Sequence, residues 1–265
     1  MMIFLNCKKE KPSMIRLSLK LAILLFILLQ AYTNAQTFGF GCLGFTGGYG
    51  GYSYQKYQAN GLNEYIRVFN LSRHDSLSEN LNNFGSAKGF RVGLNFFRKK
   101  FSSVFITAKG FYQTLNEKHQ AVEQLASGSV STTYEVKLTN WGVGFDLGVP
   151  IISILNWKII DAALTYNQAR FSNAQNFPGA LTIVKNYKSD FRLGYSIGTG
   201  IIVEILGEYI TLEGLAAYSK ITINEMKMDD GTKLMKYENS PEEMKNFIVE
   251  GGFNAVIQLN IGLPL

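Results

Sequence analysis

Much of the chain alternates apolar and polar positions with a period of two, which is typical of strands that present one apolar face. The last segment is the longest example, because every second residue from Phe247 to Leu263 is apolar or glycine. Segments that begin at Phe90, Trp141 and Phe191 repeat the pattern. The alternation predicts strands near residues 37–50, 86–97, 101–115, 131–149, 156–170, 188–205, 208–224 and 247–263.

The connections between these strands alternate in length. Short connections cover residues 98–100, 150–155 and 206–207, and long ones cover 51–85, 116–130, 171–187 and 225–246. Short turns at one end and long loops at the other are typical of an up-and-down transmembrane β-barrel. An even number of strands places both termini on the short-turn side, which is the periplasmic side of a bacterial outer membrane.

A soluble eight-stranded barrel of the lipocalin type has the same alternation, so the faces must be compared. The polar face is rich in glycine, which suits a crowded small lumen better than a solvated surface. Each apolar face spans about ten residues, enough for a tilted strand to cross a bilayer. Aromatic residues gather towards the strand ends, as interfacial girdles do. These features favour the all-β, eight-stranded transmembrane barrel.

The first 35 residues have the pattern of a secretion signal. Leu21 to Leu29 form a short apolar run, with Arg16 and Lys20 before it and the small residue Ala35 after it. A spanning helix needs about 20 apolar residues, so the run predicts a cleaved signal rather than an anchor. We therefore expect a signal peptide at 1–35 and a barrel domain at 36–265, whether translation starts at Met1 or at Met14.

Cleavage changes the meaning of the composition. The 265 residues are 46% hydrophobic and 17% charged, with a formal net charge of +6. The first 35 residues carry +4 of that charge, so the rest of the chain is nearly neutral. Nucleic acid is therefore not an expected partner. Cys42 is the one cysteine that remains, which excludes an intramolecular disulfide in the mature chain.

The signal that ends at Ala35-Gln36, the eight glycine-rich alternating strands and the terminal strand FNAVIQLNIGLPL resemble the small outer-membrane β-barrel proteins of the porin family. The architecture is similar to the eight-stranded OmpA and OmpX type. This resemblance implies an outer-membrane location, contact with outer-membrane lipids and biogenesis by the β-barrel assembly machinery. It implies no single activity and no cofactor.

Charged residues on the polar face predict an ion-pair network inside the barrel. The interior of an eight-stranded barrel is only wide enough for side chains to fill it. Charges buried there are costly unless they are paired and hydrogen-bonded. The alternative is that several of them lie at the rims in solvent. The candidate residues are Arg91, Lys109, Lys137, Asp146, Asp161, Arg192, Glu213 and Glu250.

The first long connection has helical spacing. Leu62, Tyr65, Ile66 and Phe69 follow the i, i+3, i+4, i+7 pattern of an amphipathic helix. Three roles are open for these residues: a lid over the barrel mouth, a surface that binds an extracellular partner, or local packing that stabilises the loop.

Enzymatic chemistry has little support in the sequence. His74, Asp75 and Ser76 have the residue types of a hydrolase triad, but three consecutive residues are poorly placed to relay a proton. The two histidines, His74 and His119, and Cys42 have no zinc-site spacing. We expect a non-enzymatic surface protein with a structural or adhesion role. Passive passage of small solutes and modification of outer-membrane lipids remain as alternatives.

Overall fold

The computed structural model describes residues 46–101, 103–126, 128–207 and 209–263. Its one described helix is α2 (Asn60–Ser72). The strands are β1 (Thr46–Lys56), β2 (Leu77–Glu79), β3 (Ser86–Phe101), β4 (Val104–Leu125), β5 (Gly128–Ile152), β6 (Leu155–Asn176), β7 (Ile183–Lys188), β8 (Arg192–Leu206), β9 (Ile210–Lys220) and β10 (Gly252–Leu263).

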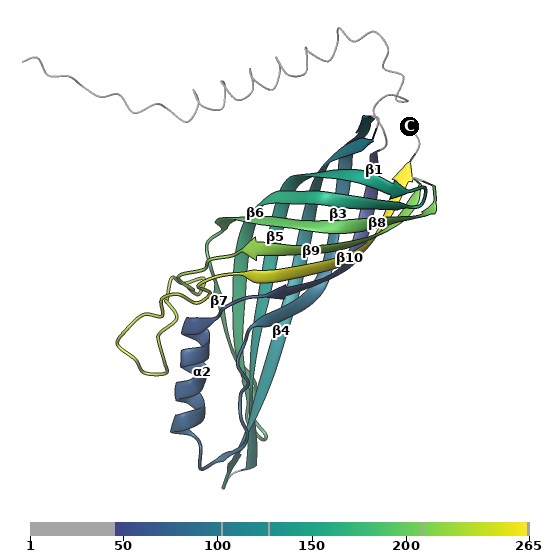
Figure 1. Cartoon of the computed structure of the whole chain (residues 1–265). Coiled ribbons are helices and arrows are strands. Elements are labelled where there is room, and N and C mark those ends of the chain that lie inside the picture. The colour runs from purple at the N-terminus through teal and green to yellow at the C-terminus, as the bar shows by residue number, and fades with distance from the viewer. Residues whose placement is uncertain (1–45, 102, 127, 208, 264–265) are drawn as a thin grey trace, which may run out of the picture. The chain divides into compact units, whose positions relative to one another are not determined.

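Eight of these strands close into a barrel. The order around the ring is β1, β3, β4, β5, β6, β8, β9 and β10, and β10 pairs with β1 to close it. Every neighbouring pair is antiparallel, and sequential ring strands are neighbours (Figure 1). The up-and-down eight-stranded barrel expected from the alternation is therefore confirmed. The predicted signal peptide at 1–35 and most of the first predicted strand lie outside the described residues.

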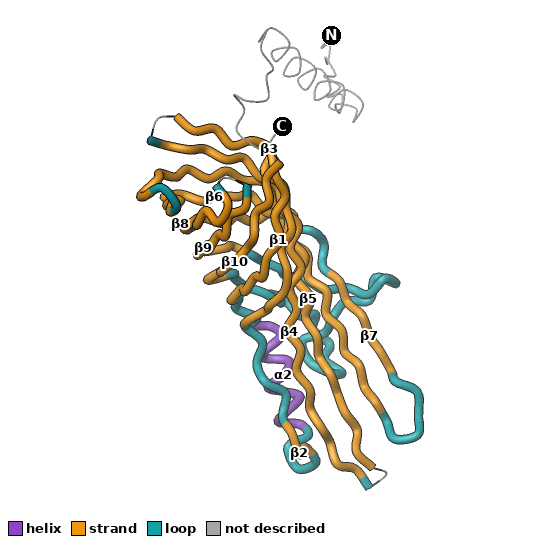
Figure 2. The backbone as a smooth tube through the Cα atoms, turned by 90° about the vertical axis from the view of Figure 1, so that its right-hand side faces the viewer, coloured by secondary structure: helices purple, strands orange, loops and turns teal. Residues whose placement is uncertain are grey.

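Three strands are much longer than the sequence pattern predicted. β4 has 22 residues, β5 has 25 and β6 has 22, so the segments 116–130 and 171–187 are largely strand rather than loop. β7 adds to the edge of β6, and β2 adds to β4. These strands continue beyond the barrel to the end at which α2 lies (Figures 1 and 2). A strand needs only about 9–11 residues to cross a bilayer, so roughly half of each long strand projects.

The inner face of the long strands changes character along their length. Gln113 of β4 pairs with Asn140 of β5, and both are buried polar side chains. One inward layer further on, Leu115 pairs with Leu138, and both are buried apolar side chains. We call the part below this change the lumen. The part above it, with α2, β2, β7 and residues 221–251, is called the outer domain.

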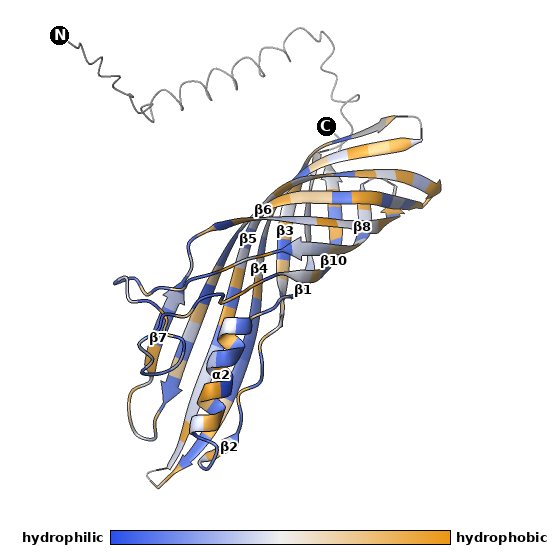
Figure 3. Ribbon diagram, turned by 60° about the vertical axis from the view of Figure 1, so that its left-hand side comes forward, coloured by the Kyte–Doolittle hydropathy of each residue, from blue (hydrophilic) through white to orange (hydrophobic). Residues whose placement is uncertain are grey.

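The outer face changes in the opposite sense at the same level. Tyr112 pairs with Trp141, and below them exposed apolar side chains cover the barrel wall (Figure 3). Two outward positions higher, Asn116 pairs with Lys137, and the outer face is polar. A strand that is apolar outside and polar inside thus becomes polar outside and apolar inside. This inversion explains why the upper segments looked like polar loops in the sequence.

The outer domain has a hydrophobic core that α2 helps to build. Leu62, Tyr65, Ile66 and Phe69 are all buried, and the Phe69 ring lies 5.7 Å from that of Tyr134 on β5. Residues 221–251 close the core from the other side with short isolated bridges and buried side chains such as a phenylalanine, isoleucines and methionines. In the part of the chain that the structure describes, no helix is long and apolar enough to span a membrane.

Candidate functional site

A β-bulge on β6 builds the centre of the lumen. Lys158 pairs with Gly148 of β5, but Ile160 pairs with Leu147, so β6 has one extra residue at this point. Ile159 and Ile160 are consequently both exposed on the outer face. Lys158 and Asp161, three residues apart, both point into the lumen, because a bulge re-aims the side chains on its two sides.

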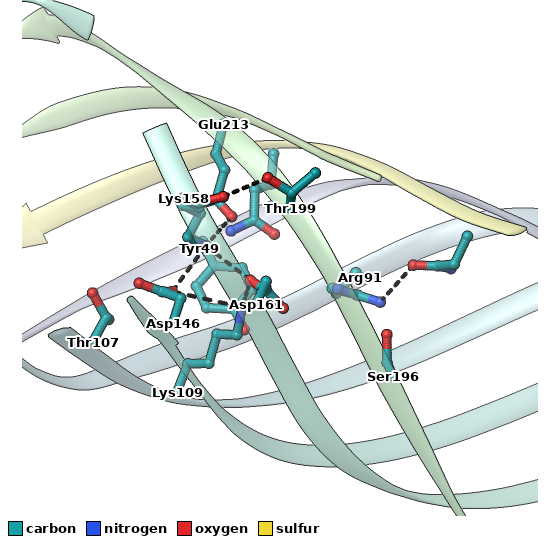
Figure 4. A network of polar contacts seen from close by, with 12 residues as sticks. Tyr49, Arg91, Thr107, Lys109, Asp146, Lys158, Asp161, Ser196, Thr199 and Glu213 are labelled. Atoms are coloured by element: carbon teal, nitrogen blue, oxygen red, sulfur yellow. Dashed lines mark hydrogen bonds and ion pairs between the residues drawn. The ribbon is translucent and has the colours of Figure 1, made fainter. Parts of the chain in front are cut away.

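Lys158 is bound by three carboxylates. Its Nζ lies 2.8 Å from Asp146 Oδ2 and 3.0 Å from Asp161 Oδ2, and it also donates to Glu213 Oε1 (Figure 4). Lys109 donates to Asp161 Oδ2 and lies 3.7 Å from Asp146 Oδ2. All five side chains are at most 5% exposed. The two ammonium groups and three carboxylates therefore form one cluster, which we call the lumen cluster.

Arg91 is the third buried cation of the lumen and completes its charge balance. Its Nε donates to Gln113 Oε1 at 2.7 Å, and its Nη2 lies 3.4 Å from Asn254 Oδ1. The guanidinium carbon lies 4.2 Å from the centre of the Phe111 ring, a cation–π distance. Tyr49 donates to the carbonyl of Gly110 at 3.2 Å. With Arg91, three buried cations face three buried anions.

The cluster and its neighbours occupy the section of the barrel that they cross. Glu213 also lies 3.4 Å from Asn260 Nδ2, whose amide bonds Thr211 at 3.1 Å. Thr199 bonds the backbone carbonyl of Lys158 at 2.6 Å. A buried charge is tolerated when its remaining hydrogen-bonding positions are satisfied. This arrangement gives a small barrel a polar, charge-balanced interior built from side chains.

Three of the candidate lumen charges lie elsewhere. Lys137 is exposed on the outer face, because β5 keeps its alternation and places Val136 and Leu138 inside at that level. Arg192 is exposed at the first residue of β8, where the lumen wall begins. Glu250 precedes β10 and accepts the hydroxyl of Tyr218.

The irregular backbone at Gly251 accounts for the position of Glu250. Gly251 lies outside β10, and a Cβ added there would lie 1.9 Å from the carbonyl oxygen of Ser219. The chain therefore needs glycine at this close approach to β9. The alternation that placed Glu250 in the lumen does not continue through this point, and the strand begins only at Gly252.

Lys158 is the lumen residue that sequence reasoning missed. Strict alternation puts Lys158 and Asp161 on opposite faces, so only one of them could belong to the polar side. The signal in the sequence is the apolar doublet Ile159-Ile160 between a lysine and an aspartate. Two consecutive apolar residues on an otherwise alternating strand indicate a bulge with both residues outside.

Comparisons with known proteins were made at the level of sequence and of structure. No known protein family model matches this sequence, and no curated protein matches it. Among solved structures, the chain is similar to Ail, the attachment invasion locus protein of Yersinia pestis, with TM-score 0.38, 10% identity and coverage of 83% of this chain and 99% of that one. The same protein in complex with the heparin analogue sucrose octasulfate matches with TM-score 0.36, 8% identity and coverage of 82% and 97%.

A second similar structure is Neisserial surface protein A. It matches with TM-score 0.40 and 12% identity, and the match covers 82% of this chain and 97% of that one. The fold of this chain is established by its own strand pairing.

The helix residues of the outer domain do not form a free surface. Leu62 and Ile66 are fully buried, and Tyr65 and Phe69 are nearly so. All four pack into the core over β5 and β6 rather than projecting to solvent. Of the three roles open for these residues, the structure therefore shows local packing, and an extracellular partner would have to bind elsewhere.

Glu117 of β4 closes the junction between the lumen and the outer domain. Its carboxylate accepts the hydroxyl of Tyr57 at 2.7 Å and the backbone N–H of Ser86 at 2.7 Å, and it lies 3.0 Å from Nε2 of His119. Burial, followed by the charge of Glu117, raises the pKa of Tyr57 well above its usual value. Tyr57 therefore remains a neutral hydrogen-bond donor.

The candidate triad residues do not form a proton relay. His74 Nε2 lies 2.9 Å from Asp75 Oδ1, and both side chains are largely exposed. Ser76 instead donates to Glu123 Oε1 at 2.7 Å and to the backbone carbonyl of Arg73 at 3.0 Å. Among the described residues, no group of three or more His, Cys, Asp and Glu side chains is placed to hold a metal ion.

Proposed function

We propose that this protein is an integral outer-membrane β-barrel with a closed lumen and a folded extracellular domain that serves in cell-surface interaction. The observation that carries the proposal is the inversion of polarity along β4, β5 and β6. Side chains below the Tyr112–Trp141 row are apolar outside and polar inside, as a barrel wall in lipid requires. Above that row the strands are polar outside, as in water.

The lumen cluster supports a closed barrel rather than a solute channel. Lys158 contacts side chains from β5, β6 and β9, so it bridges the lumen from several sides. Above it, the core that includes Phe171, Phe247 and Ile248 forms a second, apolar layer. Water and ions would have to cross both layers, and the proposal therefore favours a structural or adhesion role over passive transport.

The short-turn end of the barrel faces the periplasm in this proposal, and the outer domain faces the medium. The signal peptide at 1–35 would deliver the chain to the periplasm, and the β-barrel assembly machinery would insert it among outer-membrane lipids. The outer domain offers partners an exposed β6–β7 connection, where Leu181 is 92% exposed. The role is non-enzymatic, since Ser76 of the candidate triad bonds Glu123 rather than His74.

Location is tested by membrane fractionation, with gels run before and after boiling. We expect the chain in the outer-membrane fraction, with a mobility that shifts on boiling, because a folded barrel resists the detergent at room temperature. A peptide tag inserted at Gly179, a turn residue with open space around it, should be labelled on intact cells. Recovery in a soluble fraction with no mobility shift would refute the membrane barrel.

Closure of the lumen is tested by recording from purified protein in a planar bilayer. We expect no large, steady single-channel conductance from the native chain. A steady conductance would refute the closed lumen and favour passage of small solutes. Cells that carry the chain with and without residues 177–182 should then differ in adherence, since this connection projects from the outer domain. Equal adherence would place the interaction elsewhere.

A further inference from the structure

Three basic side chains lie side by side on the outer face, just above the aromatic row. Lys137 of β5 pairs directly with Arg170 of β6, and Arg170 pairs directly with Lys188 of β7. All three side chains are exposed. Like charges that lie directly opposite one another destabilise a sheet. We call these three residues the basic row, and their arrangement favours an anion between them.

The basic row is only partly neutralised by the chain itself. Lys188 Nζ lies 2.8 Å from Asp229 Oδ1. The hydrogen bond from Lys188, its charge and, more weakly, the charge of Arg170 lower the pKa of Asp229. Within the described ranges, Lys137 and Arg170 make no hydrogen bond or ion pair. The row lines an open depression of about 420 Å³ between β5, β6 and β7.

An apolar groove lies below the basic row on the same wall of the barrel. Its volume is about 720 Å³, and its lining is almost entirely apolar. Gly110 leaves room in the groove, because a Cβ there would lie 2.8 Å from the ring of Phe96. Other residues that line the groove are Val92, Leu94, Tyr112, Trp141, Val143 and Leu164.

The groove and the basic row follow one another along two paired strands. Trp141 pairs with Tyr166 at the top of the groove, and Lys137 pairs with Arg170 four residues further along. At about 3.4 Å per residue the two levels lie roughly 14 Å apart. Neutral polar side chains lie between them. An acyl chain, a polar linker and an anionic headgroup would meet complementary surfaces in this order.

We propose that this face binds an anionic, phosphate-bearing lipid of the surrounding leaflet. An acyl chain lies in the apolar groove, and the phosphate lies between Lys137 and Arg170. Guanidinium groups bind phosphate through two parallel hydrogen bonds, and lysine adds a point charge. The inference rests on the proposed location in a membrane, and it assigns the β5–β6 wall as a specific lipid site rather than a general lipid contact.

Native mass spectrometry of the purified barrel in neutral detergent tests the site. The protein is titrated with phosphatidylglycerol, with phosphatidylcholine of the same acyl chains, and with inorganic phosphate. We expect phosphatidylglycerol to bind about tenfold more tightly than phosphatidylcholine, and inorganic phosphate to bind far more weakly than either. The double variant Lys137→Gln/Arg170→Gln should lose about tenfold for phosphatidylglycerol and little for phosphatidylcholine.

Matched variants separate the site from general effects of charge and shape. Lys220→Gln/Lys245→Gln removes two exposed lysines away from the row and should keep the native lipid preference. Val143→Trp fills the groove and should weaken both lipids. Ile257→Trp makes the same change on the exposed outer face of β10 and should weaken neither.

The results also distinguish this inference from the proposed function. Equal affinity of the native barrel for the two lipids, or an equal loss in the control lysine variant, overturns the anionic site. Unchanged affinity in Val143→Trp overturns the position of the acyl chain, and phosphate binding as tight as that of the lipid overturns a lipid ligand. If the mobility shift on boiling is retained in these samples, the barrel is folded and only the inference has failed.

Discussion

Replacing Lys158 by methionine tests whether the lumen cluster holds the barrel together. Methionine has a similar length and no charge, so the change removes the cation and keeps most of the volume. Asp146, Asp161 and Glu213 would then face each other with Lys109 as the nearest ammonium group. The three carboxylates come from β5, β6 and β9, so their repulsion acts between strands of the ring.

The expected cost follows from the burial of the cluster. Lys158 is 1% exposed and touches all three carboxylates. Removing one partner from a buried ion pair costs about 3–5 kcal/mol, because the remaining charge is left uncompensated. A loss of about 4 kcal/mol changes the folding equilibrium roughly a thousandfold. Adding Glu213→Gln to the variant removes one excess anion and should recover part of this loss.

Urea unfolding in phospholipid vesicles measures the effect. The two tryptophans, Trp141 and Trp157, are exposed on the outer wall, so their fluorescence reports contact with lipid. Lys220→Met is the control, because its exposed side chain should change the free energy of unfolding by less than about 0.5 kcal/mol. If Lys158→Met unfolds within about 1 kcal/mol of the native chain, the carboxylates do not depend on Lys158 and the reasoning is wrong.

Further variants test the bulge, the outer core and the lipid-facing wall. Deleting Ile160 removes the bulge and turns Lys158 towards lipid, so we expect no band with folded mobility on unboiled gels. Phe171→Ala should destabilise the outer domain by about 3–5 kcal/mol, seen as faster proteolysis there, whereas loss of the barrel's mobility shift would contradict separate layers. Phe145→Arg on the apolar wall should cost about 2–4 kcal/mol in vesicle unfolding but Thr139→Arg only about 0–1, and equal costs would misplace the bilayer.

The outer domain shows how one strand serves two environments. β5 alternates from Gly128 to Pro150 with its even-numbered residues inward, yet those residues are apolar above Asn140 and mostly polar or glycine below it. The geometry of the strand is the same in both halves. Only the solvent outside changes, from lipid to water, and the hydrophobic effect reverses which face must be apolar.

The sequence determined the number of ring strands and their apolar faces. A period of two is a local property, and a continuous wall of exposed side chains such as Val92, Val143 and Ile257 follows from it directly. It also placed Arg91, Lys109, Asp146, Asp161 and Glu213 on the inner side, where the structure has them buried. The helical spacing of residues 62–69 was likewise local, and α2 forms there.

Only the tertiary structure decided the depth at which each charge lies and which charges meet. The bulge that brings Lys158 to Asp161 depends on pairing with both neighbouring strands, and the close approach at Gly251 depends on β9. The position of Lys137 outside, beside Arg170, required knowing that β5 continues past the membrane level and that β6 and β7 pair with it in that register. Alternation specifies a face, but a ring of paired strands specifies a level, and the level sets whether a charge is buried, solvated or next to lipid.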